Sequence, residues 1–136
     1  MSKNIAIMLI DDDEDDRDLF QMALHELDTK VDFIGVENCC DALTMLEDKT
    51  ATPDFIFLDL NMPQMSGREC LTNLKNSLLL SHIPVIIFST SSDPRDIKET
   101  KDMGAIDFIT KPPRTSELTI ILKNFILNQT VISNNR

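Results

Sequence analysis

The sequence has no run of about 20 apolar residues, the length that an apolar helix needs to span a bilayer. Its short N-terminal apolar run leads into acidic residues, where a secretory signal would carry small residues at a cleavage site. Repeats, low-complexity segments and linkers are also absent. We therefore expect a cytoplasmic location, no membrane segment and one domain over residues 1–136, with its core at about residues 5–127.

Basic residues are scarce. The chain has 13 Lys and Arg against 23 Asp and Glu, which gives a formal net charge of -10 at pH 7. Binding along a nucleic-acid backbone needs a basic surface that displaces counterions. We expect proteins or metal cations as partners, and no direct binding to nucleic acid.

Cysteine is also scarce, and its spacing is not that of a metal site. Cys39 and Cys40 are adjacent, whereas zinc-binding pairs usually have residues between them, and Cys70 makes the count odd. We expect three reduced, buried thiols with no chemical role.

Five short apolar runs alternate with five longer segments of helical pattern. The runs are rich in apolar and β-branched residues, as buried strands are, and lie at residues 5–10, 31–36, 54–59, 84–89 and 106–110. Parallel strands need crossover connections, so this alternation predicts an α/β fold with a doubly wound parallel sheet.

The helical segments carry apolar residues at three- and four-residue spacing, with recognisable end signals. Asn38 is a candidate N-cap of the second helix. The third is expected to follow Gly67 and to include Leu78. Ser92 and Asp93 are candidate caps of the fourth, and the fifth is expected to begin near Ser116 and to precede a polar tail at residues 133–136.

Polar residues follow four of the predicted strands. In open α/β sheets, functional groups gather beyond the carboxyl ends of the strands, near the point where strand order reverses. We expect the following residues to meet there: Asp11 and Asp12 after the first strand, Asp59 after the third, Ser89 and Thr90 at the end of the fourth, and Lys111 after the fifth.

Carboxylates that share a pocket repel one another and resist ionisation unless a cation is present. Mg²⁺ suits such a site, because it binds one or two carboxylates together with waters and phosphate oxygens. We expect Asp12, Asp59 and the backbone carbonyl of Asn61 to bind Mg²⁺, with Asp11 acting directly or through water. Acidic residues 13–16 and 18 are expected only to stabilise a helix N-terminus.

Lys111 brings a positive charge to the same edge. We expect its ammonium to reach Asp59 and to bind a phosphate oxygen. Pro112 follows it, and a cis Lys111–Pro112 bond would aim the lysine side chain, but the sequence does not determine the isomer.

Together these motifs resemble the receiver domain of bacterial two-component response regulators. An acidic pair, "LDLNMP", "PVIIFS" and "KP" occur in the family's order, and the resemblance runs from about Ile5 to Leu127. It implies a flavodoxin-like fold with five helices and the strand order 2-1-3-4-5. Strings such as "FSTSSDPRDI" also show a weaker similarity to stand-alone regulators paired with phytochrome-type kinases.

The resemblance implies a role for each site residue. Asp59 would accept a phosphoryl group from the phosphohistidine of a histidine kinase or of a phosphotransfer protein. Asp11 and Asp12 match the pair that holds Mg²⁺, Ser89 matches the hydroxyl residue that turns toward the phosphoryl group, Thr90 is the second candidate for that role, and Lys111 matches the family's lysine. Such a chain catalyses only its own phosphorylation and dephosphorylation.

The implied output is a changed protein surface on the fourth helix, fifth strand and fifth helix, through which receivers dock target proteins or form homodimers. Phe108 stands where receivers carry an aromatic switch residue, although an ordinary core role for it stays open, and it lacks the hydroxyl of the Tyr in other receivers. Pro113 replaces a common aromatic, while Asn61 and Ser91 flank the expected phosphate. No fused output domain is expected.

Two alternative functions stay open. A haloacid-dehalogenase-type phosphatase also has a nucleophilic Asp after a strand in a Mg²⁺ site, but here Asn61 replaces the second Asp that acts as its general acid. A degenerate receiver could serve as a phosphorylation-independent scaffold. Retention of Asp59, Ser89 and Lys111 argues against that alternative.

Overall fold

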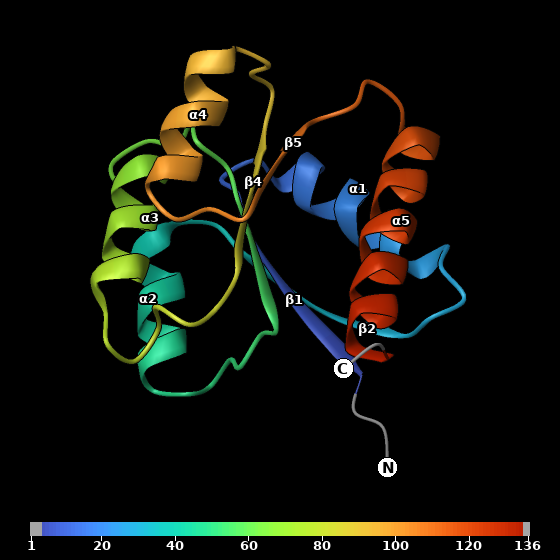
Figure 1. Cartoon of the computed structure of the whole chain (residues 1–136), viewed down its shortest axis with the longest axis horizontal. Coiled ribbons are helices and arrows are strands. Elements are labelled where there is room, and N and C mark those ends of the chain that lie inside the picture. The colour runs from blue at the N-terminus through green and yellow to red at the C-terminus, as the bar shows by residue number, and fades with distance from the viewer. Residues whose placement is uncertain (1–3, 135–136) are drawn as a thin grey trace.

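The structure, a computed structural model, describes residues 4–134 and contains one five-stranded parallel sheet with helices on both faces (Figure 1). The strands are β1 (Ile5–Ile10), β2 (Val31–Val36), β3 (Phe55–Leu58), β4 (Val85–Ser89) and β5 (Asp107–Thr110). The helices are α1 (Glu14–His25), α2 (Cys39–Glu47), α3 (Gly67–Asn76), α4 (Pro94–Asp102) and α5 (Thr115–Asn134). The strand order is β2-β1-β3-β4-β5, which confirms the predicted doubly wound topology.

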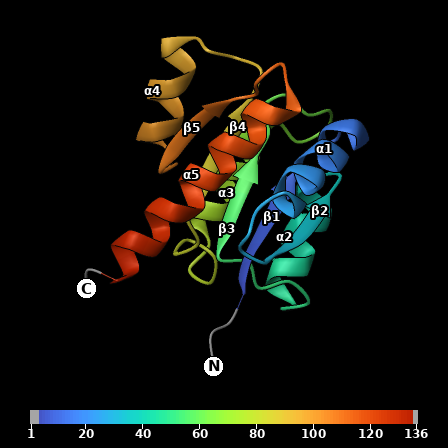
Figure 2. The same ribbon diagram turned by 90° about the vertical axis from the view of Figure 1, so that its right-hand side faces the viewer.

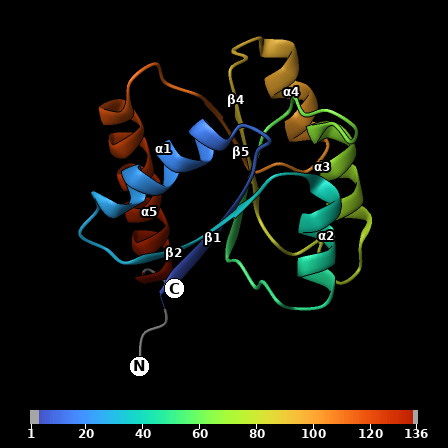
Figure 3. The same ribbon diagram turned by 180° about the vertical axis from the view of Figure 1, so that it is seen from behind.

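The two faces of the sheet have different cores. Helices α1 and α5 cover one face, and α2, α3 and α4 cover the other (Figures 2 and 3). The α1/α5 side contains edge-to-face phenylalanine pairs, for example Phe20 with Phe57 at 5.2 Å between ring centroids, while the opposite side is mainly aliphatic. Strands β1, β3 and β4 are buried between these layers, which explains their nearly continuous apolar sequence.

The predicted elements are confirmed, but some of their ends are not. Helix α3 ends at Asn76, so Leu78 lies outside it, in a turn, with a fully exposed side chain. Helix α5 begins at Thr115 and runs to Asn134, so part of the predicted polar tail is helical. Asn38 caps α2 as predicted, and Asp93 rather than Ser92 caps α4.

The prediction of three reduced, buried thiols is wrong. Cys39, at the start of α2, forms a disulfide with Cys70 of α3, and Cys40 is free and exposed. The sequence could not indicate this pair, because the two cysteines are 31 positions apart and only the packing of α2 beside α3 brings them together. Disulfides are rare in cytosolic proteins, so the pairing does not favour the expected location.

Gly67 fixes how α3 meets the end of β3. Its N–H donates to the carbonyl of Leu60 at 2.9 Å. A Cβ at this position would lie 2.2 Å from the backbone oxygen of Asp59 and 2.5 Å from the Cα of Leu60. Because both obstacles are backbone atoms, only glycine allows this approach, and the loop after β3 is held against α3.

We predict that Gly67→Ala lowers the free energy of unfolding by about 2 to 3 kcal/mol, because the methyl group must displace the backbone at Asp59. Urea denaturation measures the change. Gly35→Ala is the matched control, since its Cβ would meet side chains and no backbone atom: the ring of Phe33 at 3.0 Å and Cδ of Arg17 at 3.4 Å. Equal losses in the two variants would contradict the backbone constraint.

We also predict that unfolding in denaturant with a thiol alkylating reagent, without reductant, modifies only Cys40. After reduction all three cysteines should react, and mass spectrometry of the intact chain separates the two results. Cleaving this disulfide should lower the free energy of unfolding by about 2 to 4 kcal/mol, because the bond restrains the unfolded chain. Three modified cysteines before reduction would instead support the free thiols expected from the sequence.

Candidate functional site

Two buried carboxylates lie at the carboxyl ends of neighbouring strands. Asp59 N–H donates to the carbonyl of Ile10, and Asp11 N–H donates to that of Val36, both at 3.0 Å, so strand pairing positions both residues. Asp11 is fully buried and Asp59 is 5% exposed, whereas the neighbouring Asp12 is exposed. One oxygen from each of these three aspartates lies within 4.8 Å of the others, close enough to share one cation.

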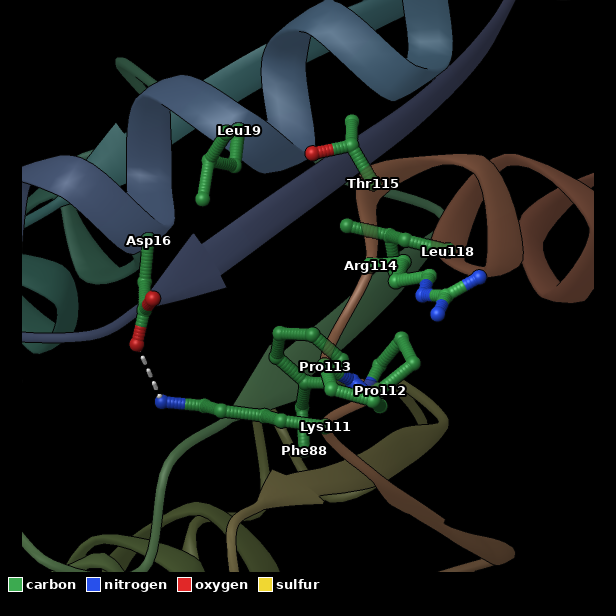
Figure 4. A pocket seen from close by; sticks show the side chains of 9 residues that line it. All are labelled: Asp16, Leu19, Phe88, Lys111, Pro112, Pro113, Arg114, Thr115 and Leu118. Atoms are coloured by element: carbon green, nitrogen blue, oxygen red, sulfur yellow. Dashed lines mark hydrogen bonds and ion pairs between the residues drawn. The ribbon is translucent and has the colours of Figure 1, made fainter.

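Lys111 lies beside these carboxylates, but its hydrogen bonds differ from those expected. Its ammonium donates to Asp11 at 2.9 Å and to Asp16 at 2.8 Å, whereas the nearest oxygen of Asp59 is 3.8 Å away (Figure 4 shows the bond to Asp16). The backbone N–H of Lys111 donates to the carbonyl of Ser89 at 2.7 Å, which ties the residue to the end of β4. Lys111 thus offsets part of the negative charge of the pocket.

Asp16 belongs to the pocket through its bond to Lys111, whereas its sequence position predicted only stabilisation of a helix N-terminus. Asp13 is the N-cap of α1 and accepts from the N–H groups of Asp15 and Asp16, so the dipole interpretation holds for the start of this helix. No pattern in the sequence separates Asp16 from its acidic neighbours. Its bond to Lys111 appears only when α1 packs beside the loop after β5.

Burial dominates the electrostatics of the pocket. It raises the pKa of Asp59 to about 6, although Lys111 lowers that pKa in part and Asp11 raises it further. Burial also raises the pKa of Asp11, against the hydrogen bond from Lys111. For Lys111 burial lowers the pKa, but the bonds to Asp11 and Asp16 outweigh it and the pKa is raised overall. The carboxylates of Asp11, Asp16 and Asp59 thus gather around one ammonium. The separate set formed by Asp11, Asp12 and Asp59 supplies the oxygen ligands that suit a divalent cation.

Asn61 stands next to the Asp59 carboxylate. Its N–H points at Asp59 Oδ1 over 3.4 Å, and this contact lowers the pKa of Asp59 against the larger effect of burial. The role of the Asn61 carbonyl as a metal ligand stays a prediction.

The two hydroxyl candidates at the end of β4 differ in burial. Ser89 is fully buried, and its Oγ accepts from the N–H of Ser91 at 3.2 Å. Thr90 is exposed. Of the two, Ser89 lies on the interior side, next to the strand that ends in Asp59, so the geometry favours Ser89.

Phe108 and the loop after Lys111 complete the surroundings. Phe108 is half-buried in β5, packs against the aliphatic core and lines a surface hollow with Ile97 and Ile106. The described residues contain no cis peptide bond, so Lys111–Pro112 is trans. Pro112 and Pro113 line a second hollow beside Lys111 and Phe88 (Figure 4).

In the part of the chain that the structure describes, no helix has both the length and the apolar character required to cross a bilayer.

The raised pKa of Asp59 makes stability depend on pH. A carboxyl whose pKa is higher in the folded than in the unfolded state binds its proton more tightly when folded. Its contribution to stability is therefore fully present below the unfolded pKa of about 4 and is lost as pH rises through about 6. Without metal at pH 7, we predict that Asp59→Asn raises the free energy of unfolding by about 1 to 3 kcal/mol.

Denaturant unfolding in chelator measures this gain, which should shrink toward pH 4 and on addition of Mg²⁺, because a bound cation stabilises the wild type. Asp18→Asn, an exposed neutralisation on α1, should change stability little. A destabilised Asp59→Asn protein at pH 7 would contradict the account of the pocket.

Known response regulators are similar to this chain in sequence. The chain is 35% identical to the two-component response regulator ORR8 of rice (Oryza sativa subsp. indica) over 117 residues, which cover 86% of this chain and 94% of that protein. It is 36% identical to ORR13 of Oryza sativa subsp. japonica over 120 residues, 88% of this chain and 96% of that protein.

Solved structures agree. The phosphorylated cyanobacterial phytochrome response regulator RcpA superposes with a TM-score of 0.82 at 32% identity, over 90% of this chain and 91% of that one. The Mn²⁺-bound response regulator Rcp1 superposes with a TM-score of 0.78 at 26% identity, over 88% and 90% of the two chains. The model of the response regulator receiver domain matches residues 7–123. This chain therefore belongs to the response regulator receiver domain family of two-component systems, and its fold is the flavodoxin-like receiver fold.

Proposed function

We propose that Asp59 accepts a phosphoryl group from the phosphohistidine of a histidine kinase or a phosphotransfer protein, in a reaction that depends on Mg²⁺. The observation that carries this proposal is the arrangement around Asp59: a buried carboxylate with a raised pKa, two further aspartates within 4.8 Å and an ammonium at 3.8 Å. A merely structural strand-end Asp would not need this combination.

In the proposed reaction a carboxylate oxygen of Asp59 attacks the phosphorus, the phosphorus–nitrogen bond breaks and the imidazole leaves with the bonding electrons. Lys111 is placed to bind an oxygen of the transferred group after a shift from its present bonds to Asp11 and Asp16. Mg²⁺, when bound, would supply charge neutralisation of the phosphoryl oxygens. Its proposed ligands are Asp11, Asp12, Asp59 and the carbonyl of Asn61.

The proposed output is a change of protein surface. The Ser89 hydroxyl would donate to a phosphoryl oxygen, moving the β4–α4 loop, and Phe108 would repack in response. Apolar Ile97 on α4 and Ile106 before β5 are exposed there, on the face proposed to bind a target protein or a second copy of the chain. Similarity to RcpA makes a phytochrome-type kinase a candidate donor.

Three further proposals follow for the domain organisation, cellular location and activity of the chain. We retain the proposals of a single receiver domain over residues 1–136, a cytoplasmic location and no enzymatic activity beyond its own phosphorylation and dephosphorylation. The one five-stranded sheet and the family match over residues 7–123 support the first.

We predict that acetyl phosphate, a small phosphodonor, adds one phosphoryl group to the wild-type chain only when Mg²⁺ is present. The same mixture should leave Asp59→Asn unmodified, because the amide cannot attack phosphorus as the carboxylate does. Intact mass spectrometry measures the addition. A folded wild type that gains no phosphoryl group would instead favour the scaffold function, and continuous hydrolysis of simple phosphate esters would favour the phosphatase.

A further inference from the structure

A chain of polar contacts connects the end of β4 to α3. Ser89 Oγ accepts from the N–H of Ser91, and Ser91 Oγ donates to Asp96 Oδ2 at 2.6 Å. The other carboxylate oxygen of Asp96 accepts from the guanidinium of Arg68. Three successive contacts therefore connect the buried hydroxyl of Ser89 to an arginine on another helix. We call this set the Arg68–Asp96–Ser91 chain.

The backbone next to Arg68 is held in place by close packing. Arg68 directly follows Gly67, whose backbone packs against that of Asp59 and Leu60. The guanidinium also donates to Glu99 of α4, so Arg68 holds α4 through two carboxylates. Arg68 therefore connects the loop after Asp59, against which Gly67 packs, to the first two turns of α4.

Its serine end is held on several sides. Ser91 Oγ accepts from the N–H of Asp93 at 3.1 Å, and the carbonyl of Ser91 accepts from the hydroxyl of Thr110 at 3.0 Å. The side chains of Arg68 and Asp96 are only 33% and 28% exposed, so solvent screens this pair less than a fully exposed ion pair. The β4–α4 loop therefore has one well-supported arrangement.

We propose that Arg68 and Asp96 are positioning residues that hold Ser91, and through it Ser89, in the arrangement seen in this structure, and so limit the rate at which Asp59 is phosphorylated. This inference rests on the proposed function. For Ser89 to turn toward a phosphoryl oxygen, the loop must leave the arrangement that these contacts stabilise. Weakening the chain raises the fraction of molecules in the alternative arrangement, and a donor that requires that arrangement reacts faster.

The test compares Arg68→Ala with Arg95→Ala. Arg95 is a matched control, since it also forms an ion pair at the start of α4. Its partner is Asp93, the N-cap of the same helix, so the pair does not connect α4 to α3, and the Arg95 side chain is 89% exposed. With acetyl phosphate and Mg²⁺, Arg68→Ala should be phosphorylated about 2- to 5-fold faster than wild type, as expected for loss of a partly exposed ion-pair network. Arg95→Ala should keep the wild-type rate, and Arg68→Lys should fall between. A rate increase separates positioning from loss of fold, which would slow the reaction.

A second measurement needs no phosphorylation. Hydrogen exchange at the amides of Ser91 and Asp93 should be faster in Arg68→Ala than in wild type or Arg95→Ala, because both amides donate within this loop. If the wild type is phosphorylated and Arg68→Ala reacts at the same or a lower rate, this inference is wrong but the proposed function still holds. Unchanged amide exchange in Arg68→Ala would have the same meaning. Failure of every variant, wild type included, to take up phosphate would overturn the proposed function itself.

Discussion

Burial of the Asp11 and Asp59 carboxylates at the ends of two central strands is the constraint on which the rest of this structure depends. Their backbone N–H groups donate to the carbonyls of Val36 and Ile10 in the neighbouring strands, so the sheet fixes where both side chains begin. The resulting repulsion is only partly offset by Lys111, whose ammonium hydrogen-bonds to Asp11 and Asp16. Carboxylates thus outnumber the one ammonium of the pocket, and a divalent cation is the partner that such a donor set is suited to bind.

A series of contacts connects the surroundings of Asp59 to helix α4. Gly67 allows the start of α3 to pack directly against the backbone of Asp59, and the adjacent Arg68 forms an ion pair with Asp96 on α4. Ser89 lies between the pocket and this bridge. The segment from Asp59 to Arg68 includes the position proposed to react and contacts α4 through Arg68, so in the proposed function a change at Asp59 has a short route to the surface at α4.

Much of this could be predicted from the sequence, because strand ends are local signals. Apolar runs followed by Asp11, Asp59 or Lys111 placed each residue at one edge of the sheet, and the topology then brought them together. Contacts between helices were not predictable. The partners Cys39 and Cys70, the bond of Asp16 to Lys111 and the bridge from Arg68 to Asp96 all depend on how helices pack on the sheet, and sequence spacing carries no signal for them. Leu78 was wrongly predicted to lie in α3, because the helical spacing of apolar residues continues in the sequence past Asn76, where the helix ends.

The Asp59 carboxylate lies in a buried pocket whose carboxylates outnumber its one ammonium. A carbon-detected NMR titration of the Asp59 carboxyl, in chelator and then in Mg²⁺, tests it most directly. We expect a pKa of about 6 without metal and a clearly lower pKa when Mg²⁺ is present. A pKa near the ordinary aspartate value of about 4 that does not respond to Mg²⁺ would contradict it.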